Sequence, residues 1–359
     1  MFAIKHGYRY PFRIKQAKRL LGDRIGLQRR CLDRPSIVLE LSSMDLLLDV
    51  GRHPWSLAID ANEVGHDLIL RCNRWVLAAL THKRFARPML SMPNVWWAGS
   101  REAAPDASLV LADRDAEPSI REEPRRVRMW IGRDHHPDCK APMPYPVFPS
   151  MRESLNTDSL SHARKQEKHG LLFAGSVHPR YARHEIENYG VADRLTLVDR
   201  CHLLMRSTPR FNQFVDLVNT DESPIPRDLW LARLAKTAFW LAAPGVAQPL
   251  CHNLSEAMSV GAIPVIEFPN RLFPHLRDGF NAIEFSGADG LSQALERISS
   301  MPASDVAKMR HQVVEYFDQY GSTRSWLKRV IADPSIENVS LPVHSENLFT
   351  SIQSQPKAA

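Results

Sequence analysis

Ser255 and Glu256 stand where a short helix is expected to begin, shortly after a buried strand. The apolar run Phe239–Gly245 predicts that strand, and the sequence SEAMSVGAIPVIEF (Ser255–Phe268) predicts a helix, a tight turn at Gly261 and a second strand. A helix N-terminus at the carboxyl end of a buried strand presents N–H groups to an anion such as a diphosphate. The segment therefore predicts a nucleotide-type ligand.

Two residues of this segment are candidate contacts for that ligand. Gly245 lets the backbone turn immediately after the strand. Glu256, near the helix start, is placed to accept hydrogen bonds from sugar hydroxyls. The alternative is that Glu256 only balances the helix dipole.

A second group of polar residues follows the expected strand Leu171–Ala174. A loop at a carboxyl strand end with several His and Arg side chains can offset the charge of a nucleotide diphosphate. The alternative is a solvated basic turn. The candidates in this loop are Gly175, Ser176, His178, Arg180, Tyr181, Arg183 and His184, with Arg183 and His178 preferred.

A catalytic base is expected in the first half of the chain. Asp60, Glu63 and His66 lie in the sequence AIDANEVGHD, directly after an apolar run. Such a group could act as a general base that takes a proton from an acceptor hydroxyl. Each of the three could equally be a helix cap or a surface charge.

A bound metal is not expected. His135, His136 and Cys139 lie close together, but no second Cys/His pair accompanies them at zinc-ligand spacing. The sequence also has no phosphate-binding P-loop and no GxGxxG fingerprint. We therefore predict no cofactor and treat any nucleotide ligand as a substrate.

The sequence around these motif residues resembles that of glycosyltransferases of GT-B architecture, in particular the exostosin-like family. The match covers residues 236–268 well and 171–330 more loosely, and residues 1–140 carry no matching motif. The matching residues are Phe239, Pro244 and Gly245 in the strand and turn, Glu256, Ala257 and Met258 in the helix, and Gly261, Ala262, Ile263, Pro264, Val265 and Ile266 in the closing run.

The resemblance implies two Rossmann-like α/β domains facing a cleft. It implies transfer of a sugar from a nucleotide-sugar donor to a glycan, lipid-linked or other acceptor, as in polysaccharide biosynthesis. Gly175, Ser176, Arg180, Gly245, Asn253, Ser255 and Glu256 would bind the donor. Arg183 and His178 would stabilise the departing diphosphate, and Asp60 would be the base.

Two positions depart from the family pattern. Gln248 stands eight positions before Glu256, where related enzymes often carry a second acidic residue, and Asn253 stands where exostosin-like members often carry Arg. These departures keep open an alternative, a catalytically inactive glycosyltransferase-like binding or scaffold protein.

The elements that must position these residues alternate between short strands and helices, which predicts an α/β layer structure. We expect helices at Arg74–His82, Trp230–Thr237, Leu254–Val260, Leu291–Ile298 and Ala303–Tyr316. The expected strands are Ile37–Leu41, Leu46–Val50, Leu68–Leu70, Leu109–Ala112 and Val127–Ile131 in the first half, and Leu171–Ala174, Leu195–Val198, Ala238–Ala242, Val265–Phe268 and Ala282–Phe285 in the second.

Length and composition predict two domains. The chain has 359 residues, 44% of them hydrophobic, and four prolines within 141–149 mark a change in composition. The expected parts are a basic N-terminal arm (1–35), an N-terminal acceptor domain (36–145), a linker (146–170), a C-terminal nucleotide-sugar-binding domain (171–335) and a flexible tail (336–359).

The basic charge is concentrated in the N-terminal arm. Residues 1–34 carry a formal charge of +8, and the remainder carries −2. Ile14, Ala17, Leu21 and Ile25 fall on one helical face, so the arm could lie on an anionic membrane surface. The alternatives are a solvated extension packed on its own domain and, less favoured, an organelle transit peptide. Nucleic-acid binding is not expected, because no binding module accompanies the charge.

The expected location is the cytoplasm. Association with a membrane surface is left open by the sequence. Five scattered cysteines suit a reducing compartment better than a disulfide framework. The N-terminus lacks the apolar region of a secretory signal.

Overall fold

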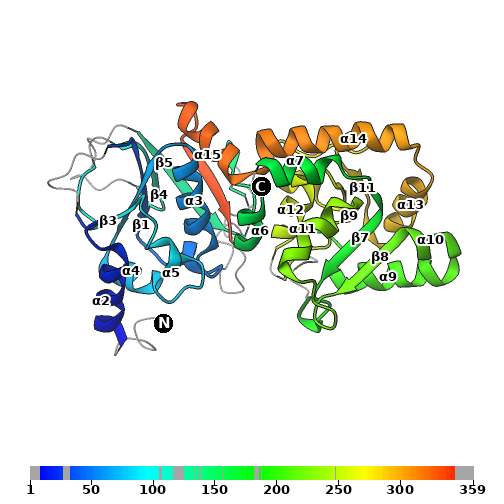
Figure 1. Cartoon of the computed structure of the whole chain (residues 1–359), viewed down its shortest axis with the longest axis horizontal. Helices are drawn as coiled ribbons and strands as arrows, with labels where there is room; N and C mark the ends of the chain where they lie inside the picture. Colours follow the sequence, from blue (N-terminus) through cyan, green and yellow to red (C-terminus); the bar gives the residue numbers. More distant parts are fainter. Residues whose placement is uncertain are drawn as a thin grey trace, which may run out of the picture. The chain divides into compact units, whose positions relative to one another are not determined.

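The computed structural model describes residues 9–26, 33–104, 107–115, 125–133, 135–136, 139–155, 157–181, 186, 188–246 and 248–343. The chain forms two compact units (Figure 1). The first comprises Met1–Met143 together with Thr323–Ala359, and the second is the continuous segment Pro144–Ser322. The chain thus leaves the first unit once and returns to it.

The first unit is built on a parallel sheet. Two of its inner strands, β1 (Ser36–Leu41) and β2 (Asp67–Cys72), are buried along their whole length, as expected for a sheet covered on both faces. The sheet order is β3 (Val95–Ala98), β2, β1, β4 (Ala107–Ala112), β5 (Arg126–Gly132), β12 (Asn338–Pro342), β6 (Ala141–Pro142).

Helices flank this sheet. The helix α3 (Arg52–Glu63) packs against β2 and against α15 (Thr323–Ala332), which the returning chain supplies (Figure 1). The other α-helices among the described residues of this unit are α2 (Tyr10–Leu21), α4 (Arg74–Leu80) and α5 (Ala86–Met89).

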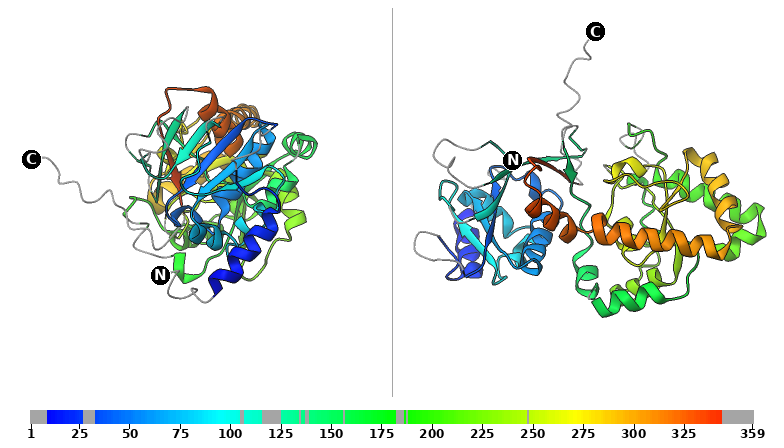
Figure 2. Two further views of the ribbon diagram at one scale, coloured as in Figure 1. Left: turned by 90° about the vertical axis from the view of Figure 1, so that its left-hand side faces the viewer. Right: turned by 90° about the horizontal axis from the view of Figure 1, so that it is seen from above.

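The predicted basic arm contains α2, which lies on the outside of the first unit (Figure 2, left, dark blue). Its Arg13, Ala17 and Leu21 are buried, and the helix contacts α4 and β3. Ile25 then forms a bridge to Trp97. Among the described residues of the arm, one helical face therefore packs on its own unit, and Phe12 remains 69% exposed.

The second unit contains another parallel sheet, with one large hydrophobic core around it. Its order is β11 (Ile283–Glu284), β10 (Ile263–Ile266), β9 (Thr237–Leu241), β7 (His169–Gly175), β8 (Val215–Asn219). Its helices are α6 (Pro149–Ser154), α7 (Thr157–Lys165), α9 (Arg194–Ser207), α10 (Pro209–Phe214), α11 (Arg227–Ala235), α12 (His252–Ser259), α13 (Gly287–Ser299) and α14 (Ala303–Tyr316).

The predicted fold class, two Rossmann-like α/β units, is confirmed. The predicted strand Leu46–Val50 is wrong, because Asp45–Leu47 form a 3-10 turn in which the Asp45 N–H and carboxylate both bond the Ser43 hydroxyl. The predicted strand Leu195–Val198 is also wrong. It lies inside α9, whose first turn is capped by the Asp193 carboxylate accepting the Thr196 N–H at 3.0 Å.

Two segments are more structured than we expected. The predicted linker contains α6 and α7, both of which pack against α11. The predicted flexible tail begins with β12, which pairs with β5 and β6 because its alternating Val339 and Leu341 are fully buried. Among the described residues, no helix is long and apolar enough to cross a membrane.

Candidate functional site

The order in which the chain adds strands to the second sheet reverses between β7 and β9. The chain places β8 on one side of β7 and then β9 on the other, so the two loops that follow β7 and β9 leave the carboxyl edge next to each other. Such a point in a parallel sheet is where open α/β folds bind ligands. The two loops that the sequence singled out, after Gly175 and around Gly245, are therefore neighbours.

Arg194, at the start of α9, ties these loops together. Its Nη1 donates to the Ser176 carbonyl at 3.1 Å, and its Nε donates to the Pro244 carbonyl at 3.1 Å. The guanidinium also lies 3.9 Å from the Tyr181 ring centroid, a cation–π contact. A side chain at Gly175 would meet Arg194 Nη1 at 3.3 Å, so the absence of a side chain at Gly175 permits this approach.

Arg194 was not among the site residues predicted from the sequence. It lies 18 residues beyond Ser176 and 50 before Pro244, directly before the segment Leu195–Val198 that we expected to be a strand. The available signal was Asp193 with Thr196, a helix-start pattern that would have placed Arg194 in the first turn of a helix.

The helix α12 starts at the same edge. Its first residues have no side-chain cap, and Asn253 Nδ2 donates to the Ala174 carbonyl at 3.2 Å, which holds the helix start beside the end of β7. Gln248, in the loop before it, is 1% exposed, and its Nε2 has no hydrogen-bond partner among the described residues. An unpaired buried amide of this kind is a donor available to a ligand.

Glu256 is held by protein groups. Its Oε1 accepts the Phe148 N–H at 2.8 Å and lies 3.0 Å from His252 Nδ1, and its Oε2 accepts Trp230 Nε1–H at 2.7 Å. Burial alone would raise the pKa of this carboxyl, but the His252 charge and the three hydrogen bonds outweigh it and lower the pKa. The side chain is 1% exposed, so in this structure Glu256 anchors the segment before α6 to α12.

Ser255, like Glu256, is hydrogen-bonded to another part of the protein. Its hydroxyl donates to the Tyr145 carbonyl at 3.0 Å. Ser255 and Glu256 thus both contact the Tyr145–Phe148 segment, whereas Asn253 contacts the end of β7.

The loop after β7 begins as an ordered turn. The Ser176 hydroxyl donates to Asp221 at 2.6 Å and accepts the His178 N–H, and His178 Nδ1 accepts the Arg180 N–H at 3.2 Å. His178 and Arg180 are both exposed on this loop. Arg183 and His184 lie outside the described residues.

The remaining candidates lie elsewhere. Asp60, on α3 in the first unit, is fully buried and accepts the Ser56 hydroxyl at 3.2 Å, and that hydroxyl in turn lies 2.9 Å from the Thr323 hydroxyl of α15. Glu63 pairs with Arg324 at 3.3 Å. His136 stacks on Trp130, and no group of three metal-ligating side chains gathers in the described part of the chain.

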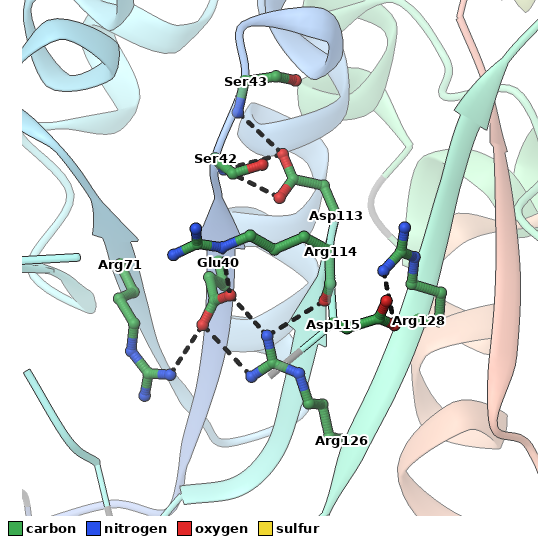
Figure 3. Close-up of polar contacts among 9 residues, drawn as sticks. All are labelled: Glu40, Ser42, Ser43, Arg71, Asp113, Arg114, Asp115, Arg126 and Arg128. Atoms are coloured by element: carbon green, nitrogen blue, oxygen red, sulfur yellow. Dashed lines mark hydrogen bonds and ion pairs between the residues drawn. The ribbon is translucent and has the colours of Figure 1, made fainter. Parts of the chain in front are cut away.

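A second constellation, which the sequence analysis missed, surrounds Glu40 in the first unit (Figure 3). The Glu40 carboxylate contacts three guanidinium groups, those of Arg71 at 3.0 Å, Arg114 at 3.4 Å and Arg126 at 2.5 Å. The three arginines come from β2, from the residues after β4 and from β5. No local spacing signals such a cluster, because its members are 31 to 86 residues from Glu40.

Comparisons with known proteins find distant structural likeness. No family model and no curated protein sequence matches the chain. Similar solved structures include a glycosyltransferase from Rickettsia africae ESF-5, with a TM-score of 0.46, 8% identity, and coverage of 84% of this chain and 98% of that one.

Two further structures are similar at lower scores. One is Anabaena Alr3699/HepE in complex with UDP and glucose, with a TM-score of 0.34, 11% identity, and coverage of 83% and 98%. The other is an alpha-glucosyltransferase in complex with UDP and a 13-mer DNA, with a TM-score of 0.38, 12% identity, and coverage of 83% and 99%.

Proposed function

We propose that the protein is a glycosyltransferase that moves a sugar from a nucleotide-sugar to a glycan or lipid-linked acceptor. The observation that carries the proposal is the switch point of the second sheet, where the loops after β7 and β9 and the start of α12 meet. The motif of residues 239–266, which resembles the exostosin-like family, lies at this same edge. The proposal includes the GT-B arrangement, with the donor bound by the second unit.

The donor diphosphate would be held by N–H groups of the uncapped α12 start, with the Gln248 amide as an additional donor. His178 and Arg180 would approach it from the loop after β7, together with Arg183. The positive charge of the arginines would stabilise the departing diphosphate, whose negative charge grows in the transition state. No metal is required by this arrangement.

Gln248 provides the sharpest test. Gln248→Leu removes a buried unpaired amide, so the free protein should be as stable as the parent or more stable. Its affinity for a nucleoside diphosphate should fall about tenfold, the loss of one hydrogen bond to a charged group. Isothermal titration with UDP, GDP, ADP and TDP measures this.

Gln166→Leu, on a partly exposed position after α7, is the matched control and should leave affinity unchanged. No binding of any nucleotide by the parent protein would contradict the proposal. Equal losses in both variants would remove Gln248 from the site.

The alternative is a glycosyltransferase-like binding protein without turnover. The observation that favours it is the engagement of Glu256 and Asn253 by protein groups, which leaves fewer polar side chains for a sugar. Nucleotide-sugar binding without release of the nucleoside diphosphate, in the presence of a panel of glycan acceptors, would favour this alternative.

A peripheral membrane contact through residues 1–34 is part of the proposal. Phe12 lies on the outer side of α2. The ring of Tyr10 stacks on the ring of Trp75, which is 40% exposed, with the ring centroids 3.8 Å apart. Exposed aromatic rings beside basic side chains suit an anionic lipid surface. The exposed basic residues here are Arg9, Lys15, Lys18, Arg19 and Arg74.

Cosedimentation with vesicles tests this contact. Binding to phosphatidylserine vesicles should exceed binding to phosphatidylcholine vesicles and should weaken in Phe12→Ser. The control, Phe280→Ser, changes an aromatic residue of the second unit that is 39% exposed. Equal binding by both variants and the parent would contradict the contact.

A further inference from the structure

We propose that His252 binds the diphosphate of the nucleotide-sugar through its Nε2–H group, and that Glu256 is the positioning residue that orients the His252 ring. This role rests on the proposed function, because it requires that the second unit binds a nucleotide-sugar. It adds to the donor site a titratable group that was not among the site residues predicted from the sequence. It also gives the buried Glu256 carboxylate a role other than contact with the sugar.

His252 lies at the switch point of the second sheet. It is the first residue of α12, and its two neighbours in the chain contact residues at the ends of adjacent strands. Cys251 Sγ lies 3.9 Å from the Ala243 carbonyl oxygen, just after β9, and Asn253 Nδ2 donates to the Ala174 carbonyl of β7 at 3.2 Å. His252 is therefore held at the edge where the diphosphate is expected to bind.

His252 and Glu256 form a hydrogen-bonded pair on one face of α12. Side chains four positions apart in a helix are neighbours, and His252 Nδ1 lies 3.0 Å from Glu256 Oε1. Burial raises the pKa of Glu256, but the His252 charge and three hydrogen bonds outweigh burial and lower the pKa. The carboxyl group is thus ionised and can only accept hydrogen bonds. Nδ1 of His252 must therefore carry a proton, which it donates to Glu256.

The second ring nitrogen of His252 is accessible to a ligand. Among the described residues, none forms a hydrogen bond with Nε2, and the His252 side chain is 32% exposed, whereas that of Glu256 is 1% exposed. The Phe148 ring packs beside the imidazole, with the two ring centroids 5.6 Å apart. Because Nδ1–H is donated to a buried carboxylate, the ring is fixed in orientation. A ligand at this edge of the sheet therefore meets Nε2.

The chemistry of Nε2 suits a diphosphate. An anion beside the ring favours the imidazolium form, in which Nε2 also carries a proton and donates a charge-assisted hydrogen bond. The N–H groups at the start of α12 attract the same anion. The Glu256 carboxylate balances the ring charge from the buried side, so the imidazolium of His252, and not the carboxylate, meets the ligand.

Other charged or titratable groups near the His252 ring come from several elements. Arg227 of α11 lies with its guanidinium carbon 5.6 Å from the Phe148 ring centroid. Burial raises the pKa of the Cys251 thiol, so this group stays uncharged near neutral pH. The remaining charged or titratable groups described at this edge are His178, Arg180 and Arg194. Because one of them is a second histidine, a variant of His252 is needed to assign an effect of pH to this ring.

Titration with nucleotide-sugars at two pH values tests the role of His252. UDP-, GDP-, ADP- and TDP-glucose are the probes, because their diphosphate is esterified at both ends and keeps its charge between about pH 6 and about pH 8, the range in which histidines commonly change charge. For the probe that binds best, the intact protein should show about tenfold higher affinity at the lower pH, the gain of one hydrogen bond between charged groups. Isothermal titration measures this difference.

His252→Gln removes the ring charge at a partly exposed position, so the fold should be retained. Its affinity at the lower pH should fall about tenfold, and the difference between the two pH values should disappear. His311→Gln is the matched control and should bind as the parent does. His311 also lies four positions before a glutamate in a helix, with Nε2 3.3 Å from Glu315 Oε1, but its side chain is 69% exposed on α14.

Glu256→Gln tests the positioning role. The amide oxygen can still accept a hydrogen bond from the Phe148 N–H or from Trp230 Nε1–H, but the charge that balances the imidazolium is lost. Affinity should therefore fall more at the lower pH than at the higher pH, and the pH difference should shrink. Equal losses at both pH values would show that Glu256 has only a structural role and would overturn the positioning assignment.

Two outcomes separate this proposal from the proposed function. Binding by the parent with the same pH difference in His252→Gln, or with no loss of affinity in that variant at the lower pH, would overturn the role of His252 and leave the donor site in place. Absence of binding of all four nucleotide-sugars by the parent at both pH values would contradict the proposed function itself, and the role of His252 with it.

Discussion

Arg194 is the residue on which the geometry of the proposed donor site depends most directly. A guanidinium can donate to two carbonyls at once in a fixed fork, whereas an ammonium carries its donors on a single atom. The carbonyls of Ser176 and Pro244 belong to separate loops, so the fork sets the separation of these loops.

Arg194→Lys should therefore weaken nucleoside diphosphate binding by about tenfold and lower the free energy of unfolding by about 1–3 kcal/mol, because one carbonyl loses its donor. Isothermal titration and urea denaturation measure the two effects. Arg200→Lys, on the same helix with its guanidinium on exposed Asp289, is the matched control and should change stability by less than about 1 kcal/mol. Equal changes in both variants would contradict the role given to Arg194.

His53 gives the first unit a pH-dependent stability. Burial lowers the pKa of His53 to about 4, with Arg52 also lowering it and Asp49 opposing. The ordinary pKa of an unfolded histidine is about 6.5, so between pH 4 and 6.5 the unfolded chain binds more protons than the folded one. Stability should therefore rise with pH across this window and fall by about 3 kcal/mol as the pH drops from about 6.5 to 4.

Urea denaturation at a series of pH values checks this expectation. His53→Leu should flatten the slope between pH 4 and 6.5. His311→Leu, with a 69%-exposed ring, should retain it. A slope that survives unchanged in His53→Leu would show that other groups produce it.

At the scale of elements, periodicity and capping predicted most of the second unit. The helix Ala303–Tyr316 has the bounds we expected, and the strand–helix–strand segment around α12 is confirmed. Short apolar runs misled the prediction where a local cap decided the conformation, at Asp45 and at Asp193. The strand β8 was missed because its inward and outward residues, VDLVN, do not form a clear apolar run.

The site residues also fall into two groups, those predicted from local patterns and those brought together by contacts between distant segments. The sequence indicated the loops and the α12 start because they are local patterns attached to strand ends. It did not indicate the role of Arg194, which depends on contacts with two loops distant in the chain, or the arginines around Glu40, which are brought together by pairing between distant strands. It also could not indicate that Glu256 would be buried against Trp230 and Phe148.

The turn after α12 is an element-scale requirement for glycine. Gly261 has φ +80°, and an added Cβ would meet Val314 Cγ2 of α14 at 3.0 Å. Gly261→Ala should lower the free energy of unfolding by about 2 kcal/mol, from backbone strain and from contact with α14. Gly190→Ala is the control, since Gly190 has φ +68° with no atom within 4 Å of an added Cβ, and should cost about 1 kcal/mol. Urea denaturation compares them, and equal losses would exclude a contribution from α14.

At the scale of the whole molecule, the two units differ in whether they are formed by one continuous segment of the chain or by two. The second is one uninterrupted segment with its own core. The first is complete only when the chain returns, because α15 packs on α3 and β12 lies between β5 and β6. Trp326 of α15 is fully buried and donates its Nε1–H to the Ala141 carbonyl at 2.9 Å.

Expressed fragments should therefore behave differently. Residues 144–322 should fold alone with a cooperative urea transition, whereas residues 1–143 should not, because the fragment lacks the strand that pairs with both β5 and β6 and the helix that covers α3. Addition of a peptide of residues 323–343 to fragment 1–143 should restore a cooperative transition, and the same peptide with Trp326→Asp, which places a charge at a fully buried position, should not. Circular dichroism and amide hydrogen exchange follow the recovery. Cooperative unfolding of fragment 1–143 without the peptide would show that the first unit does not depend on the returning chain.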